Sequence, residues 1–151
     1  MGNDVKESIL TEISKIDDLI NFIKPLLKMG KSKEFVQIEL IAIAMTLHSF
    51  YNGLERISSL FLDKFNDFIP SDSQWHKTLL KVMFGLNSKN INFIRSDLQN
   101  TVENYLSFRH LVRNIYCTEL VWDRMKMLAE NLEETWTMIK SDFESLLERS
   151  L

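Results

Sequence analysis

The chain has 151 residues, 45% of them hydrophobic, and a formal net charge of −3, which suits one folded domain with a sizeable core. The acidic balance excludes nucleic-acid binding through overall charge, so any RNA contact has to come from a local basic patch. Only four glycines and two prolines are present, whereas a sheet protein needs such residues for a turn about every ten positions, so the composition predicts an all-α fold.

Two long helices are predicted in the first half of the chain. Apolar residues recur every three or four positions over residues 4–28, where Pro25 should kink or loosen the last turns and Gly30 should end the helix. The second helix covers residues 33–65, and Gly53 marks a point where it bends or closely approaches another backbone. Its expected buried face consists of Phe35, Ile38, Ala42, Met45, Leu54, Ile57, Phe61 and Phe65.

Two shorter helices are predicted in the middle of the chain from their starting signals. Ser71, with Gln74 three residues later, has the form of a capping box that opens the third helix. Ser96 and Gln99 repeat this signature and open a fourth helix, which is expected to end near Cys117.

The last predicted helix covers residues 123–149, where apolar positions again keep helical register. Five helices with short connections predict an antiparallel helical bundle. No internal repeat and no linker divides residues 1–151, so we expect a single domain. No stretch reaches the roughly 18 to 20 apolar residues that span a membrane, and the start lacks the pattern of a signal peptide. We therefore expect a cytoplasmic protein that does not contact a membrane.

The segment 108–116, FRHLVRNIY, concentrates polar residues in the fourth helix. Positions i, i+1, i+4 and i+5 of a helix form one small surface patch, so Arg109, His110, Arg113 and Asn114 are expected to lie together. Two guanidinium groups one turn apart repel each other modestly, and a bound phosphate would offset that repulsion. This patch is the candidate phosphate-binding and catalytic site.

The same residues could also have a purely structural role. The two arginines could be solvated or paired with acidic residues such as Glu55 or Glu119, and the histidine could be an ordinary surface residue. Tyr51 and Glu55 are four residues apart on the second helix and could point toward the patch, with Glu55 orienting an arginine. The alternative for Glu55 is an ordinary surface carboxylate.

The remaining histidines and the cysteine give no sign of a metal site. His48 and His76 are far apart in the sequence, and both are expected to serve packing or capping, as is Trp75. The single cysteine, Cys117, cannot form an internal disulfide or a thiolate site by itself. No metal-ligand spacing and no glycine-rich phosphate loop occur, so neither a metal nor a cofactor is expected.

Three segments together resemble the HepT-like members of the HEPN family. The run FRHLVRNIY, followed by glutamate and leucine at 119–120, resembles their signature region. The run HSFYNGLERI at 48–57 resembles the matching part of their second helix, as does the Trp-His pair at 75–76. The family motif is arginine, four variable residues, histidine, one residue and tyrosine. Here Arg109 matches the arginine and Tyr116 matches the tyrosine.

The resemblance implies a metal-independent RNase that acts as the toxin of a toxin–antitoxin system. In such a reaction the 2′-hydroxyl of RNA attacks its neighbouring phosphate, the arginine offsets the developing charge and the histidine moves a proton. Asn114 occupies the histidine position, and a carboxamide cannot exchange a proton near neutral pH as an imidazole does. His110 lies beside the motif and could take over this role. Whether the chain cleaves RNA therefore stays open at this point.

The resemblance also implies partners. The motif helices of a homodimer face each other in this family, so each site is shared and contains Arg109 from both chains. An MNT-type nucleotidyltransferase antitoxin adds AMP to the motif tyrosine, here Tyr116, for which the alternative is a half-buried ring with a bonded hydroxyl. Two other functions remain open: a catalytically degenerate dimer that binds RNA, nucleotide or the nucleotidyltransferase without cleavage, and a purely structural helical module.

Overall fold

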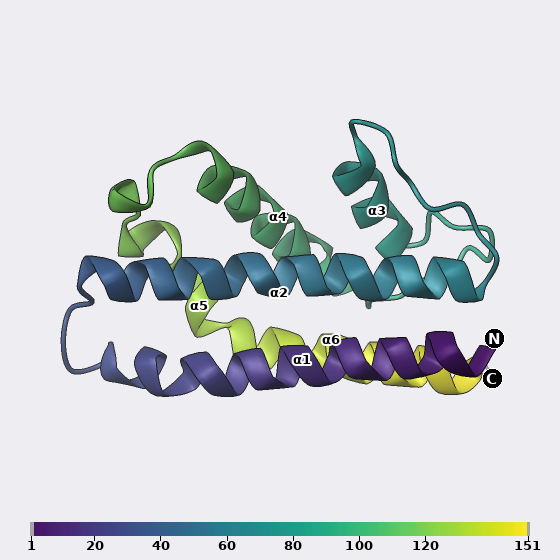
Figure 1. Ribbon diagram of the computed structural model, residues 1–151, viewed down its shortest axis with the longest axis horizontal. Coiled ribbons are helices and arrows are strands. Elements are labelled where there is room, and N and C mark those ends of the chain that lie inside the picture. The colour runs from purple at the N-terminus through teal and green to yellow at the C-terminus, as the bar shows by residue number, and fades with distance from the viewer. Residues whose placement is uncertain (1, 151) are drawn as a thin grey trace.

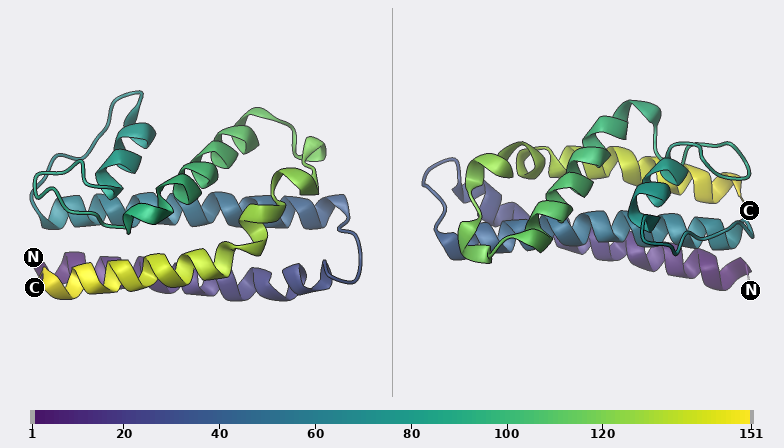
Figure 2. Two further views of the ribbon diagram at one scale, coloured as in Figure 1. Left: turned by 180° about the vertical axis from the view of Figure 1, so that it is seen from behind. Right: turned by 90° about the horizontal axis from the view of Figure 1, so that it is seen from above.

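A computed structural model describes residues 2–150, and two long antiparallel helices set its long axis (Figure 1). These are α1, Gly2–Met29, and α2, Gln37–Lys64. Helix α6, Leu132–Arg149, packs against α1 and runs antiparallel to it (Figure 2). The described residues form no β-strand, so the predicted all-α helical bundle is confirmed. None of the described helices carries an apolar stretch long enough to cross a membrane.

Helices α3, Trp75–Met83, and α4, Gln99–Asn114, lie on the side of α2 that is opposite α1 (Figure 1). Both contact α2, and α5, Lys126–Glu130, leads from this layer to α6. Three single 3₁₀ turns complete the order: η1, Ser96–Leu98; η2, Cys117–Glu119; and η3, Trp122–Arg124. Helix α2 is therefore enclosed between α1 on one side and α3 and α4 on the other.

Helix α1 buries the face that its sequence predicts. Its buried stripe consists of Ile9, Ile13, Ile16, Ile20 and Ile23. The helix continues through Pro25, which removes a backbone hydrogen bond only near the helix end, and its last residue is Met29. Gly30 follows, as predicted, and a Cβ atom at this position would overlap the ring of Phe35. A larger residue at position 30 would therefore displace the ring of Phe35.

The predicted buried face of α2 is wrong in the first half of the helix. Ile38 is 79% exposed and Met45 is 51% exposed. The buried stripe there consists of Leu40, Ile43, Leu47 and Phe50. Because α2 is covered from two opposite sides, apolar residues occur around much of its circumference, and spacing alone fits more than one face.

The predicted capping box at the start of α3 does not form. The helix begins at Trp75 with Gln74 at its N-cap, and no side chain caps it. Asp72 holds this turn, because its Oδ1 accepts the N–H of Gln74 at 2.9 Å and its carbonyl accepts the N–H of Trp75 at 3.2 Å. A carboxylate is a stronger acceptor of backbone N–H groups than the hydroxyl of Ser71 would be.

The later helix boundaries also differ from the prediction. A 3₁₀ turn begins at Ser96 and α4 begins at Gln99, again without a side-chain cap, and α4 ends at Asn114 rather than near Cys117. The predicted helix 123–149 is broken at Asn131 into α5 and α6. The break lets α5 contact α2 while α6 contacts α1, which one straight helix could not do.

Gly53 is a point of close approach between α1 and α2. A Cβ atom on this residue would lie 2.8 Å from Cδ1 and 3.0 Å from Cγ1 of Ile16 on α1. The close approach that the sequence predicts is therefore present, although the neighbour is a side chain and not another backbone. Gly53 follows directly after Asn52. The contact with Ile16 therefore fixes the position of α2 relative to α1 close to the residue that bonds Arg109.

We expect Gly53→Ala and Ile16→Val to be coupled. Alanine favours a helix over glycine by about 1 kcal/mol, but its methyl group would collide with Ile16, and valine removes the nearest of the two atoms. Gly53→Ala should therefore stabilise the Ile16→Val protein more than the wild type, by about 0.5–1 kcal/mol. Urea unfolding of the wild type, both single variants and the double variant measures this difference. Additive effects would contradict the close approach.

Candidate functional site

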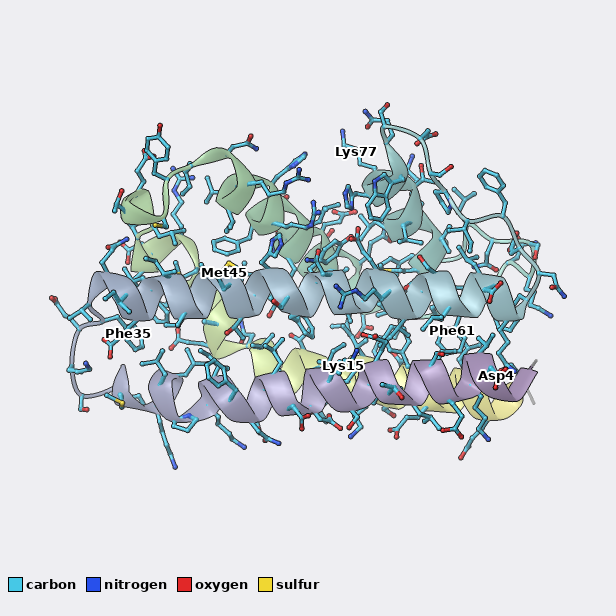
Figure 3. The ribbon with its side chains drawn as sticks, in the orientation of Figure 1. Asp4, Lys15, Phe35, Met45, Phe61 and Lys77 are labelled. Atoms are coloured by element: carbon cyan, nitrogen blue, oxygen red, sulfur yellow. The ribbon has the colours of Figure 1, made fainter. Side chains whose placement is uncertain are left out.

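The face of α2 toward α3 and α4 carries polar side chains at helical spacing. His48, Asn52 and Glu55 lie one turn apart along this face. Polar side chains gather above α2, between α3 and α4 (Figure 3). Arg109 reaches this region from α4, where its Nε donates a hydrogen bond to Oδ1 of Asn52 at 2.9 Å. The contact joins two helices that lie far apart in the sequence.

Arg109 is buried but forms no ion pair with a described residue. The residue is 8% exposed, and its Nη1 atom is enclosed without a hydrogen-bond partner. Among the residues that the structure describes, neither Arg109 nor Arg113 forms an ion pair with a carboxylate. The pairing with Glu55 or Glu119 considered above is thus absent, and Glu119 instead accepts the N–H of Tyr116 at 2.8 Å. Asn52 orients the guanidinium group without neutralising it.

Glu55 lies beside Arg109 but bonds to a different helix. Its carboxylate is 4% exposed, and its Oε2 lies 2.7 Å from Nδ1 of His76 on α3. Burial raises the pKa of Glu55, while the hydrogen bond to His76 and the charges of His76 and Arg109 oppose this shift. Burial and the nearby charge of Glu55 raise the pKa of Tyr51 far above its usual value, so this phenol stays protonated. Tyr51 and Glu55 both belong to the polar interior around Arg109.

His48 lies one turn before Asn52, on the part of α2 that faces the two arginines. It is partly buried, and its Nδ1 atom is enclosed without a hydrogen-bond partner. Burial and the positive charges of Arg109 and Arg113 lower the pKa of His48 below its usual value. The imidazole is consequently neutral at pH 7, although the sequence favoured a packing or capping role for this residue.

The patch predicted on α4 divides into an inner and an outer part. Arg109 points inward, whereas His110, Arg113 and Asn114 are exposed. The Nδ2 of Asn114 donates to the carbonyl of His110 at 2.7 Å and so closes the last turn of the helix. Tyr116 follows the helix and is 80% exposed, so the half-buried ring considered above is not formed. One helix therefore presents a buried cation to α2 and three polar side chains to solvent.

A cavity of about 690 Å³ opens beside Arg109. Arg109, Asn52 and Glu55 form part of its wall, and Trp75 contributes an aromatic side chain. This volume lies within the range of small-molecule sites, about 300–1,000 Å³. No group of three or more described histidine, cysteine, aspartate or glutamate side chains is arranged to hold a metal ion. The arrangement suits an anion that enters the cavity and meets the guanidinium group.

Sequence reasoning missed three members of this site. Asn52 makes the direct contact to Arg109, His76 pairs with Glu55, and His48 lies beside both arginines. A signal for two of them was present, because His48 and Asn52 share the helical spacing of Glu55 on the same face of α2. The contact with His76 depends on how α3 packs, which helical spacing does not reveal.

We expect the pH dependence of stability to change in His48→Gln. The lowered pKa means that the unfolded chain takes up a proton at this position before the native state does. The free energy of unfolding should therefore fall as the pH drops from above 6.5 through the native pKa, and glutamine removes this contribution. Urea unfolding at pH 7.5 and pH 5.5 should show that the free energy of unfolding falls less between these two values in the variant than in the wild type. Equal losses in both proteins would contradict the placement beside the arginines.

The geometry can be compared with known proteins. Residues 42–150 match the family model described as HepT-like protein. The matched segment contains His48, Asn52 and Glu55 from α2 together with all of α3 and α4, so it includes most of the site. No curated protein and no solved structure matches the chain. Because the match covers well over half of its length, the chain belongs to the family of HepT-like proteins.

Proposed function

We propose that this chain is the toxin component of a toxin–antitoxin system and acts as a metal-independent RNase whose phosphate-binding group is Arg109. The observation that carries this proposal is the guanidinium group that Asn52 orients and no carboxylate neutralises. A planar guanidinium matches the oxygens of a phosphate and forms strong charge-assisted hydrogen bonds with them. Membership of the HepT-like family supports the same function.

The chemistry needs proton transfer in addition to phosphate binding. The 2′-oxygen of one nucleotide forms a bond to phosphorus while the bond to the 5′-oxygen of the next nucleotide breaks. One group removes the 2′ proton, and a proton has to reach the leaving 5′-oxygen. Asn114 cannot perform either step, and its amide is already bonded to its own helix. His48, which is neutral at pH 7, and the exposed His110 are the groups that could move these protons.

The proposed active form is a homodimer in which the outward residues of α4 meet the partner chain. Within one chain, Gln37 joins the start of α2 to the segment after α4, because its Nε2 donates to the carbonyls of Cys117 and Leu120. Exposed apolar side chains border this junction, and we call them the junction surface: Val36, Ile38, Tyr116 and Val121. A second copy would cover them and bring His110 and Arg113 of two chains together.

Tyr116 is the proposed target of an MNT-type nucleotidyltransferase antitoxin. Its ring is exposed and follows directly after the helix that carries Arg113 and Asn114, so a modifying enzyme can reach its hydroxyl. An AMP group attached there would place a phosphate and a bulky base beside the arginine-bearing helix. Such an adduct would compete with RNA for the same positive charge.

The second candidate is a degenerate dimer that binds RNA, nucleotide or the nucleotidyltransferase without cleavage. Asn114 favours it, because the motif position offers no titratable group. A purely structural module is less well supported, because it would have neutralised the buried charge of Arg109 with a carboxylate from the same chain.

We expect Arg109→Ala to lose RNA cleavage by at least about 100-fold, because it removes the charge that stabilises the reacting phosphate. Purified wild type and variant are incubated with a mixed set of RNAs in the presence of a metal chelator. Arg149→Ala, an exposed arginine at the end of α6, is the matched control and should cleave like the wild type. Circular dichroism checks that the helices remain intact.

The outcomes distinguish the RNase from the degenerate dimer and test the role of Arg109. Cleavage lost only in Arg109→Ala establishes the RNase, and His48→Gln and His110→Gln then identify the group that moves the proton. Unchanged cleavage in Arg109→Ala would remove this residue from the mechanism. RNA binding without cleavage in the wild type supports the degenerate dimer, and a gain of cleavage in Asn114→His would trace the loss to that position.

We expect a mass of two chains at micromolar concentration in solution. Ile38→Asp places a charge in the junction surface and should yield a folded monomer. Phe22→Asp is the matched control, because Phe22 is also a largely exposed apolar residue but lies on α1, away from the junction surface. Light scattering on the three proteins measures the mass. A monomeric wild type would rule out the shared site.

A further inference from the structure

The wall of the cavity beside Arg109 carries both charged and apolar side chains. Its volume of about 690 Å³ can hold a ligand larger than a phosphate ion. Arg109 and Asn52 provide polar groups. Trp75, Leu60 and Ile69 provide the apolar side chains. A ligand that uses the whole cavity therefore needs an anionic group and a flat or apolar group in one molecule.

The buried guanidinium group of Arg109 selects an anion. Arg109 is more than nine-tenths buried, lines the cavity and has an Nη1 atom without an acceptor. A buried donor without a partner is unfavourable by about 1–3 kcal/mol, so a ligand that supplies an acceptor removes this cost. Because the neighbouring Asn52 is neutral and no carboxylate of the described residues forms an ion pair with Arg109, the guanidinium group can bind a phosphate, although the charge of Glu55 lies nearby.

The apolar side chains suit a nucleobase. Trp75 opens α3 and is partly exposed, and its ring lies close to the ring of His76, with 3.5 Å between the centroids. His76 is itself held by Glu55, so the tryptophan has a fixed neighbour. Nucleobases stack on aromatic side chains, with about 1–3 kcal/mol per base. Only an unpaired base can enter such a cavity, because a base inside a duplex is already stacked and paired.

The remaining charges on the wall disfavour a ligand with more than one phosphate. Glu12, Glu55 and Asp63 line the cavity together with Arg56, so the carboxylates outnumber the guanidinium groups. Glu12 lies 3.3 Å from Lys15 and 3.9 Å from Arg56, and Glu55 is engaged with His76. Asp63 has no such ion pair among the described residues, so a second or third phosphate would meet an uncompensated carboxylate.

We propose that this cavity binds one nucleoside monophosphate unit, with its phosphate on Arg109 and its unpaired base against Trp75. The proposal deepens the proposed function and rests on it for the role of Arg109, since the unit would be one residue of a single-stranded RNA. It assigns base binding to α3 and to a cavity within one protomer. A free mononucleotide offers the same chemistry.

The test measures binding by calorimetry with AMP, UMP, ADP, adenosine and inorganic phosphate as probes. Both monophosphates should bind more tightly than ADP, adenosine or phosphate. Trp75→Leu should weaken monophosphate binding about tenfold or more, and Arg109→Ala should abolish it. Trp122→Leu is the matched control and should bind like the wild type, because Trp122 is a partly buried tryptophan that packs on Phe35, outside this cavity. No binding of either monophosphate, or equal binding by Trp75→Leu, would overturn the proposal.

A second series separates the two sources of the ligand and the two proposals. Short 2′-O-methyl RNA cannot be cleaved by 2′-oxygen attack, so it is compared as a single strand, as a duplex and with abasic positions. Tighter binding of the intact single strand, lost in Trp75→Leu, supports an RNA residue as the occupant. Monophosphate binding without oligomer binding supports the cavity with a free nucleotide and counts against the RNase. Cleavage of ordinary RNA that is unchanged in Trp75→Leu would retain the RNase and reject the cavity as its base site.

Discussion

The rest of the structure depends on the burial of α2 from two opposite sides. One side meets the isoleucine stripe of α1, and at Gly53 the contact is so close that an added methyl group would displace the side chain of Ile16. The opposite side carries Asn52 and Glu55, which are covered by α4 and α3. Because a tightly packed helix cannot shift, the polar side chains on its other side are held in place before any ligand arrives. An apolar contact thus sets the position of the polar site.

The choice of a neutral residue opposite Arg109 has a direct consequence for binding. A carboxylate in place of Asn52 would satisfy the guanidinium group and make it compete less well for a phosphate. An amide orients the group through one hydrogen bond and leaves its charge available. The enclosed Nη1 without a partner is a local cost to stability, and such costs concentrate at functional sites. Glu55 lies nearby but bonds to His76 and forms no ion pair with Arg109.

Local sequence patterns predicted where the helices lie better than they predicted which neighbouring helices each one contacts. The stripe of α1 was predictable because only one side of that helix is buried, whereas Ile38 and Met45 were assigned to the core because α2 is apolar on several sides. The site was predictable only in part, since helical spacing brings Arg109 and His110 together but cannot say which of two neighbouring positions faces inward. The inward position of Arg109 depends on its contact with Asn52, which lies 57 positions earlier in the chain.

The segment that matches the family model does not contain the whole cavity wall. The family match begins at residue 42 and so leaves out α1, Gly2–Met29. Yet α1 supplies Ser8 and Glu12 to the cavity wall, and Glu12 lies 3.9 Å from Arg56 of α2. The wall around Arg109 therefore depends partly on residues outside the matched segment.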